Sequence, residues 1–142
     1  MSLAVKLRRA PGRIATGAFI LNTGLDKLRA DEQTAKALHT MAADAYPVFA
    51  KMEPKKFLTM LAVGEVALGS TLLLPLMPAA VAGLGLAAFS GSLLGMWWRT
   101  PGMHEPGSPR PTHQGIPLAK DLWMFGIGTG LVVDAATSRT KG

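Results

Sequence analysis

A long and almost uncharged segment in the middle of the chain constrains the fold more than any other feature. Between Phe57 and Trp98 the only ionisable side chain is Glu65. A helix needs about 20 apolar residues to cross the hydrocarbon core of a bilayer, so this segment is long enough for two crossings. A single domain of this size has too little surrounding protein to bury two such helices in a dry core. The sequence therefore predicts an all-α membrane protein.

Four apolar segments predict four transmembrane helices packed as a bundle in a single domain over residues 1–142. The predicted spans are residues 14–28, 57–74, 78–98 and 118–136. Pro11 and Gly12 are expected to separate a basic arm, residues 1–13, from the first span. Only 17% of the residues are charged, against roughly 25% in typical soluble domains.

The connection between the first two spans predicts an amphipathic helix that lies at the membrane interface. Asp31 is expected to cap the start of this helix and Pro47 to end it. Its apolar face is formed by residues at helical spacing: Ala35, Leu38, Met41, Ala42 and Ala45. The connection over residues 99–117 is rich in proline and is expected to be an extended loop.

The net charge of +6 is explained by basic residues that flank the apolar segments. Such residues anchor and orient membrane helices, whereas a nucleic-acid surface would need a basic stripe with interleaved aromatic residues. Nucleic-acid binding is therefore not expected. Four basic residues precede the first span, namely Lys6, Arg8, Arg9 and Arg13. The positive-inside rule then places both termini in the cytoplasm, with Trp97, Trp98 and Trp123 at the opposite interface.

Small residues mark the faces on which the helices are expected to pack. In lipid, close backbone approach replaces the hydrophobic effect as the force between helices, so small residues in register predict an interface. Such residues recur every fourth position in the third and fourth spans: Gly83, Ala87, Gly91 and Gly95, and then Gly126 and Gly130.

The polar residues within or beside the spans predict a candidate intramembrane site centred on Glu65. Ala62 and Gly69 share the helical face of Glu65, so its carboxyl group is expected to point into the bundle. A carboxyl group at this depth costs a few kcal/mol unless it is neutral or paired. The other candidate members are Asn22, Asp26, Lys27, Lys120 and Asp121.

Two interpretations of these polar residues stay open. Glu65 either fixes helix register as a protonated or hydrogen-bonded strut, or contacts a polar head group or carries a proton. Lys27, Lys120 and Asn22 are the candidates to reach it. The members near the interfaces, such as Asp26 and Asp121, also fit solvated helix ends.

Metal and haem chemistry find no support in the sequence. The chain has no cysteine, which excludes disulfides, thiol relays and iron–sulfur clusters and argues against structural zinc. His39, His104 and His113 all fall in predicted connections, where they are poorly placed to ligate a haem inside the bundle. We find no nucleophile–base pair or phosphate loop and expect no catalytic residue, and therefore no autonomous enzyme.

Three short motifs resemble the DoxX family of small bacterial membrane proteins. They are RIATGAFILNTGLDKL over residues 13–28, GEVALG over residues 64–69 and AKDL over residues 119–122. The resemblance implies a four-helix protein of the bacterial plasma membrane. Its polar positions match Asp26 and Lys27, Glu65, and Lys120 and Asp121. The long first connection and the proline-rich loop are departures from the family pattern.

The resemblance implies a role beside a membrane redox enzyme, and the residues leave two other functions open. Some family members resemble the small subunit of a thiosulfate:quinone oxidoreductase, and others are linked to protection against oxidative stress. We therefore expect an accessory subunit of a membrane-bound oxidoreductase, with other membrane subunits as partners and quinone as the candidate ligand. The alternatives are a non-catalytic scaffold and a small proton-coupled carrier centred on Glu65.

Overall fold

The computed structural model describes residues 1–139, in which helices form and no strand does. The prediction of an all-α fold is therefore confirmed for this part of the chain. The elements are α1 (Leu3–Leu28), α2 (Glu32–Ala45), the short 3₁₀ helix η1 (Pro47–Phe49), α3 (Pro54–Leu73), α4 (Ala79–Arg99), α5 (Ile116–Ala119) and α6 (Asp121–Arg139).

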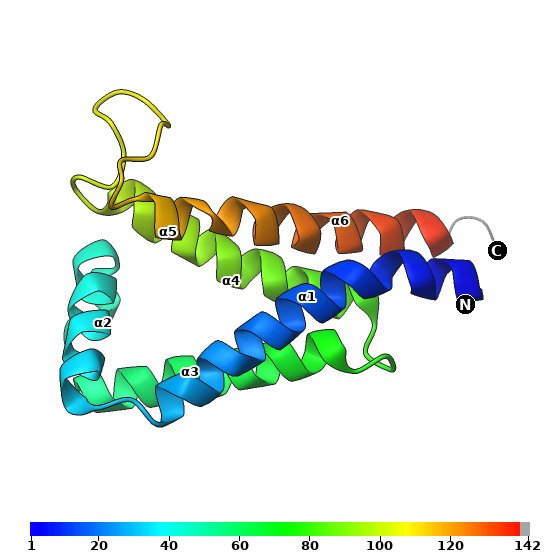
Figure 1. Ribbon diagram of the computed structural model, residues 1–142, viewed down its shortest axis with the longest axis horizontal. Helices are drawn as coiled ribbons and strands as arrows, with labels where there is room; N and C mark the ends of the chain where they lie inside the picture. Colours follow the sequence, from blue (N-terminus) through cyan, green and yellow to red (C-terminus); the bar gives the residue numbers. More distant parts are fainter. Residues whose placement is uncertain (140–142) are drawn as a thin grey trace.

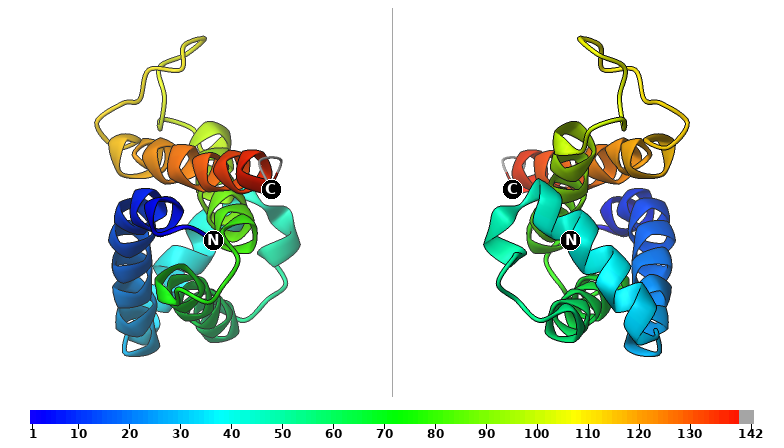
Figure 2. Two further views of the ribbon diagram at one scale, coloured as in Figure 1. Left: turned by 90° about the vertical axis from the view of Figure 1, so that its right-hand side faces the viewer. Right: turned by 90° about the vertical axis from the view of Figure 1, so that its left-hand side faces the viewer.

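The four long helices form two pairs that meet at one end of the molecule and diverge toward the other. Helix α1 packs along α3, and α4 packs along α6, whereas contacts between the two pairs are far fewer. The start of α1 and the end of α6 lie at the end where the pairs meet (Figure 1). At the other end α2 lies across the opening between the pairs, as the views along the bundle show (Figure 2).

Three of the four predicted membrane spans have the length and composition of a crossing helix. These are Pro54–Leu73, Ala79–Arg99 and Ile116–Ser138. Helix α1 is longer than any of them, at 26 residues, but it also carries several charged side chains. Among the described residues, three helices are thus long and apolar enough to cross a membrane. A fourth crossing helix stays a prediction.

The predicted break at Pro11 and Gly12 is wrong, because α1 runs through both residues without interruption. A proline inside a helix removes one backbone hydrogen bond and costs about 3 kcal/mol. Tertiary contacts on both sides of Pro11 offset this cost. Arg9 forms an ion pair with Asp134 of α6, and the guanidinium group of Arg13 binds the end of α3. The basic arm is therefore the first part of a packed helix.

Helix α2 forms where the sequence predicts it. The side chain of Asp31 accepts a hydrogen bond of 2.8 Å from the backbone N–H of Thr34, so the predicted N-cap is confirmed. The helix ends at Ala45, with Tyr46 as its C-cap directly before Pro47. The buried residues of α2 are Ala35, Ala42 and Ala45, all from the predicted apolar face.

Glycines allow the two helices of each pair to approach closely. A Cβ atom built on Gly69 of α3 would lie 2.7 Å from the backbone nitrogen of Leu21 in α1. In the other pair, a Cβ atom built on Gly128 of α6 would lie 2.7 Å from the backbone nitrogen of Ala87 in α4. These positions leave no room for a side chain, as close backbone packing in lipid requires.

The predicted packing residues lie in three different environments. Gly83 and Ala87 of α4 face α6 around Gly128, and Gly91 lies opposite the ring of Phe125. Gly95 faces Tyr46 instead of α6. A Cβ atom at Gly126 or Gly130 would meet no other atom, and both glycines lie on the exposed face of α6.

Two glycines on α3, one packed against α1 and one in open space, give a direct test of this packing. We expect Gly69→Ala to destabilise the protein by about 1–3 kcal/mol, because the added methyl group collides with the backbone of α1. Gly64, on the same helix, has open space around it. Gly64→Ala should therefore leave stability unchanged or raise it by up to about 1 kcal/mol through helix propensity. Thermal unfolding in detergent measures both, and equal melting temperatures for the two variants would contradict the packing.

The cap of α2 should depend on pH. Its hydrogen bonds with Thr34 lower the pKa of Asp31 below the ordinary value. A carboxyl group with a lowered folded-state pKa contributes stability above its unfolded-state pKa, and this contribution is lost as the pH falls through the folded-state value. Hydrogen-exchange protection of the first turn of α2 should therefore decrease in acid. Asp31→Asn caps without titrating and should remove this pH dependence, and an unchanged dependence would contradict the assignment.

Candidate intramembrane binding site

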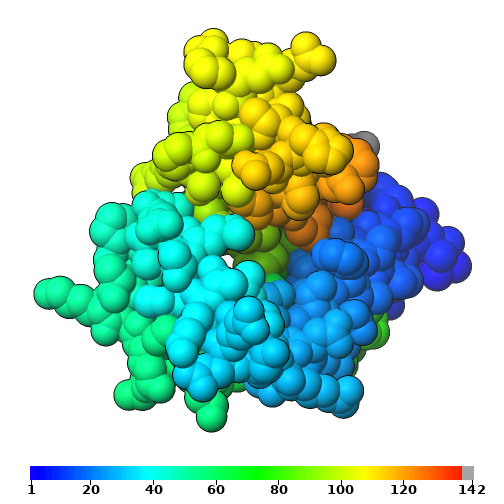
Figure 3. All heavy atoms as spheres, turned by 60° about the vertical axis from the view of Figure 1, so that its left-hand side comes forward, coloured from blue at the N-terminus to red at the C-terminus, as the bar shows by residue number. Residues whose placement is uncertain are grey.

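A cavity of about 770 Å³ lies between the two helix pairs at the end where they diverge. Figure 3 shows the hollow among α2 (cyan), α1 (blue) and the start of α6 (orange). Its wall is mostly apolar and is contributed by every long helix and by α2. Large apolar side chains in the wall include Phe19, Ile20, Phe57, Met60, Phe89 and Met124. The divergence of the two helix pairs thus leaves a cavity with a mostly apolar lining between them.

An ion pair between Glu65 and Lys27 lies in the wall of this cavity. Glu65 is only 4% exposed, and its Oε1 atom accepts a hydrogen bond of 3.1 Å from Lys27 Nζ. The same nitrogen lies 3.0 Å from Oε2, so the ammonium group pairs with both carboxylate oxygens, although only the contact with Oε1 has the geometry of a hydrogen bond. Thr23 lies beside the carboxylate, yet its hydroxyl group donates to the carbonyl of Ile20.

Local packing explains why Lys27, of the three candidates, reaches Glu65. Gly24 of α1 sits directly over Glu65, since a Cβ atom built on it would lie 3.0 Å from the Cβ atom of Glu65. This close approach brings the backbone of α1 against α3. Lys27 follows Gly24 by almost one helical turn on the same face, so its ammonium group reaches the carboxylate.

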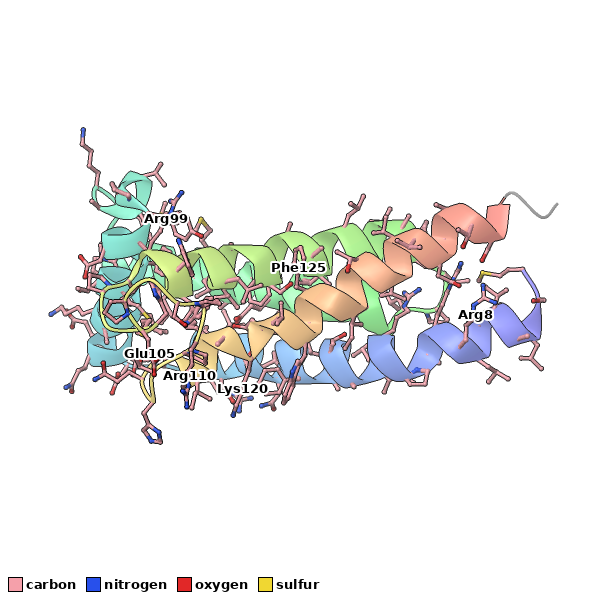
Figure 4. All side chains as sticks on the ribbon, turned by 90° about the horizontal axis from the view of Figure 1, so that it is seen from above. Arg8, Arg99, Glu105, Arg110, Lys120 and Phe125 are labelled. Carbon is pink, nitrogen blue, oxygen red and sulfur yellow. The ribbon has the colours of Figure 1, made fainter. Side chains whose placement is uncertain are left out.

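Asp121 supplies a second buried carboxyl group to the cavity. It is the first residue of α6, is 9% exposed and lines the cavity wall. Its side chain has no hydrogen bond or ion pair within residues 1–139. Lys120 lines the same cavity but is exposed. In Figure 4 it lies toward the end of the molecule that carries Arg99, away from Arg8. The cavity wall therefore includes a second acid that has no partner among the described residues.

The remaining two candidates, Asn22 and Asp26, lie on the outer surface of α1. Both are exposed, and the amide group of Asn22 donates a hydrogen bond of 3.2 Å to Asp26. Neither residue lines the cavity. The structure therefore brings Glu65, Lys27, Lys120 and Asp121 to one cavity and leaves the other two outside it.

Tyr46 closes one side of the cavity and was not among the predicted site residues. Its hydroxyl group donates a hydrogen bond of 2.6 Å to the carbonyl of Ser92 in α4. The guanidinium group of Arg99 lies over its ring at 4.9 Å. A Cβ atom on Gly95 would collide with the hydroxyl group. The signal in the sequence was Gly95 itself, whose place in the small-residue series indicates a contact but does not identify the partner.

The histidines lie outside the cavity wall. His39 shares a hydrogen bond of 2.8 Å with the carbonyl of Phe49, and the ring of His104 stacks on Trp98 at 4.3 Å. Across the part of the chain that the structure describes, no group of three or more histidine or acidic residues is placed to hold a metal ion.

Comparisons with known proteins give no assignment: no family model, no curated protein and no solved structure matches this chain. The resemblance to the DoxX family accordingly stays a prediction from three short motifs. The function is therefore inferred from the cavity and its polar groups.

The pairing of Glu65 with Lys27 predicts a specific pattern of stabilities. Lys27→Met leaves the buried carboxyl group without its cation and should destabilise the protein by up to about 5 kcal/mol. The remaining charge is then buried without a partner, and its desolvation is no longer compensated. Adding Glu65→Gln removes that charge and should restore most of the lost stability. Thermal unfolding in detergent compares the variants.

Asn22→Ala provides the control, because this exposed amide lies on the same helix and should change stability little. A double variant as unstable as Lys27→Met alone would contradict a buried ionic pair.

Proposed function

We propose that this protein is an accessory subunit of a membrane-bound oxidoreductase complex and holds a quinone in the cavity between its two helix pairs. One observation carries the proposal: an apolar cavity of about 770 Å³ has two buried acids, Glu65 and Asp121, in its wall, and Asp121 has no partner among the described residues. Pockets for small molecules have this size and this combination of apolar wall and few polar groups.

The polar groups of the cavity match both redox states of a quinone. The oxidised ring presents carbonyl oxygens, which accept hydrogen bonds from an ammonium group such as that of Lys27 or Lys120. The reduced ring presents hydroxyl groups, which donate to a carboxylate such as Asp121 or to Oε2 of Glu65, an oxygen that accepts no hydrogen bond in the described chain. The apolar wall accommodates the isoprenoid tail, and the carboxyl groups provide acceptors for the protons that leave on oxidation.

In this proposal the redox centre that exchanges electrons with the quinone belongs to a partner subunit. The chain has no cysteine and hence no thiol or iron–sulfur ligand of its own. The resemblance to the DoxX family supports an accessory role in the bacterial plasma membrane. The three apolar helices fit contact with a lipid bilayer.

Helix α1 is proposed as the fourth crossing, with both termini in the cytoplasm. It packs on α3 along much of its length, at Gly17 near the end of α3 and at Gly24 in its middle. A helix paired in this way with a crossing helix passes through the same depth of the bilayer. Its outward face exposes Ile14 and Leu25, as expected of a helix in contact with lipid.

The proposal is tested by quinone binding to the purified protein in detergent. Decylubiquinone should raise the melting temperature, and decane, which lacks the ring, should not. Asp121→Asn and Glu65→Gln should each weaken the quinone affinity about tenfold, the effect of losing one hydrogen bond to a charged group. Asp26→Asn alters an exposed carboxyl group at the same end of the molecule and should bind as the wild type does.

The accessory role is tested separately, by purification from native membranes in mild detergent. Co-purification with a redox enzyme is the expected outcome. A protein recovered alone, whose stability decylubiquinone does not change, would show a structural scaffold instead.

A further inference from the structure

We propose a second site, for the phosphodiester head group of an anionic phospholipid, at the end of the molecule where the helix pairs meet. A cavity of about 650 Å³ lies there among the start of α1, the turn between α3 and α4, and the last turn of α6. Arg8 marks this end in Figure 4, opposite Lys120 and Arg99. The site is independent of the quinone cavity, with which it shares no lining residue.

The guanidinium group of Arg9 is the central observation. Arg9 is only 8% exposed and lines the cavity. Its Nε atom pairs with Asp134, and its Nη2 atom donates a hydrogen bond of 3.3 Å to Ser138. The remaining nitrogen, Nη1, donates to the sulfur of Met1 at 3.0 Å. A thioether is a weak acceptor, so this nitrogen of a buried guanidinium group in the cavity wall has no strong hydrogen-bond partner among the described residues.

Among the described residues, the charges around this cavity do not balance. Arg8 also binds Asp134, through a hydrogen bond of 2.6 Å from its Nε atom, so two guanidinium groups share one carboxylate. Arg13 adds a third positive charge nearby, with its guanidinium group bound to backbone carbonyls at the end of α3. Arg8 is exposed, but Arg9 and Arg13 are buried, and excess positive charge around buried guanidinium groups is costly unless an anion neutralises it. A phosphate oxygen meets this need, because guanidinium groups bind phosphate through strong, charge-assisted hydrogen bonds.

The apolar surroundings favour a phospholipid over a free anion. The cavity is bordered by Pro75, Leu76 and Pro78 in the turn between α3 and α4, and Leu76 is 93% exposed. Leu3 and Leu7 of α1 are exposed at the same end. An acyl chain covers such side chains, whereas an inorganic phosphate leaves them in water. The ends of three apolar helices also place this cavity at the depth of lipid head groups.

The experiment is a lipid titration of the full-length protein in detergent, followed by thermal unfolding and native mass spectrometry. Phosphatidylglycerol should stabilise the protein and remain bound, and phosphatidylcholine and inorganic phosphate should do neither. Arg8→Gln should weaken phosphatidylglycerol binding about tenfold. Asp134→Asn should strengthen it, because the carboxylate that competes with the phosphate for both guanidinium groups is gone.

The opposite effects of these two variants separate a lipid site from a structural ion pair. If Arg8 and Asp134 only join α1 to α6, both variants lower stability and neither raises affinity for phosphatidylglycerol, which overturns the proposal. Equal binding of phosphatidylcholine, or stabilisation by inorganic phosphate alone, overturns it as well. Arg110→Gln, at the opposite end, serves as the control for loss of one positive charge and should bind phosphatidylglycerol as the wild type does.

Discussion

The close approach of α1 to α3 is the contact on which both ends of the molecule depend. Gly24 and Gly69 remove the side chains that would otherwise separate the two backbones. At one end this approach delivers Lys27 to Glu65. At the other end it delivers Arg13 to the last turn of α3, where its guanidinium group binds carbonyls that the helix leaves without intrahelical partners. One packing interface thus positions a buried acid and satisfies a helix terminus.

The cavity follows from the way the two pairs contact each other. A small apolar cluster joins all four long helices, and its members are Ile20, Leu72, Ala82, Leu86 and Leu131. Beyond this cluster the pairs separate, and α2 with Tyr46 bridges the opening through the hydrogen bond to Ser92. A uniformly packed bundle would fill the space with side chains, since protein interiors are close-packed. Here the bridge at one end and the cluster at the other hold the space open.

Much of this arrangement is readable in the sequence, because it rests on local patterns. The apolar helices follow from composition, and the bounds of α2 follow from Asp31 and Pro47. The break expected at Pro11 failed because contacts of the flanking arginines with distant residues outweigh a local helix breaker. The face of α6 was also beyond local patterns: Gly126 and Gly130 repeat at the same spacing as the α4 series, yet Gly128 packs on α4. Spacing within one helix defines its faces but does not decide which face meets a neighbour.

The buried charged groups at the two ends of the molecule differ in how far the protein itself satisfies them. This difference indicates which of these groups stabilise the fold. The Arg13 guanidinium group is fully engaged by backbone carbonyls and stabilises the end of a helix. Glu65 is paired with Lys27, whose ammonium group donates a hydrogen bond to Oε1 and lies 3.0 Å from Oε2. Asp121 is buried without a partner in the described chain. Burying a polar group without a hydrogen bond costs free energy that packing does not return. The fold gains little from a second acid that stands without a partner in the described part of this cavity, which supports the proposal that a ligand completes it.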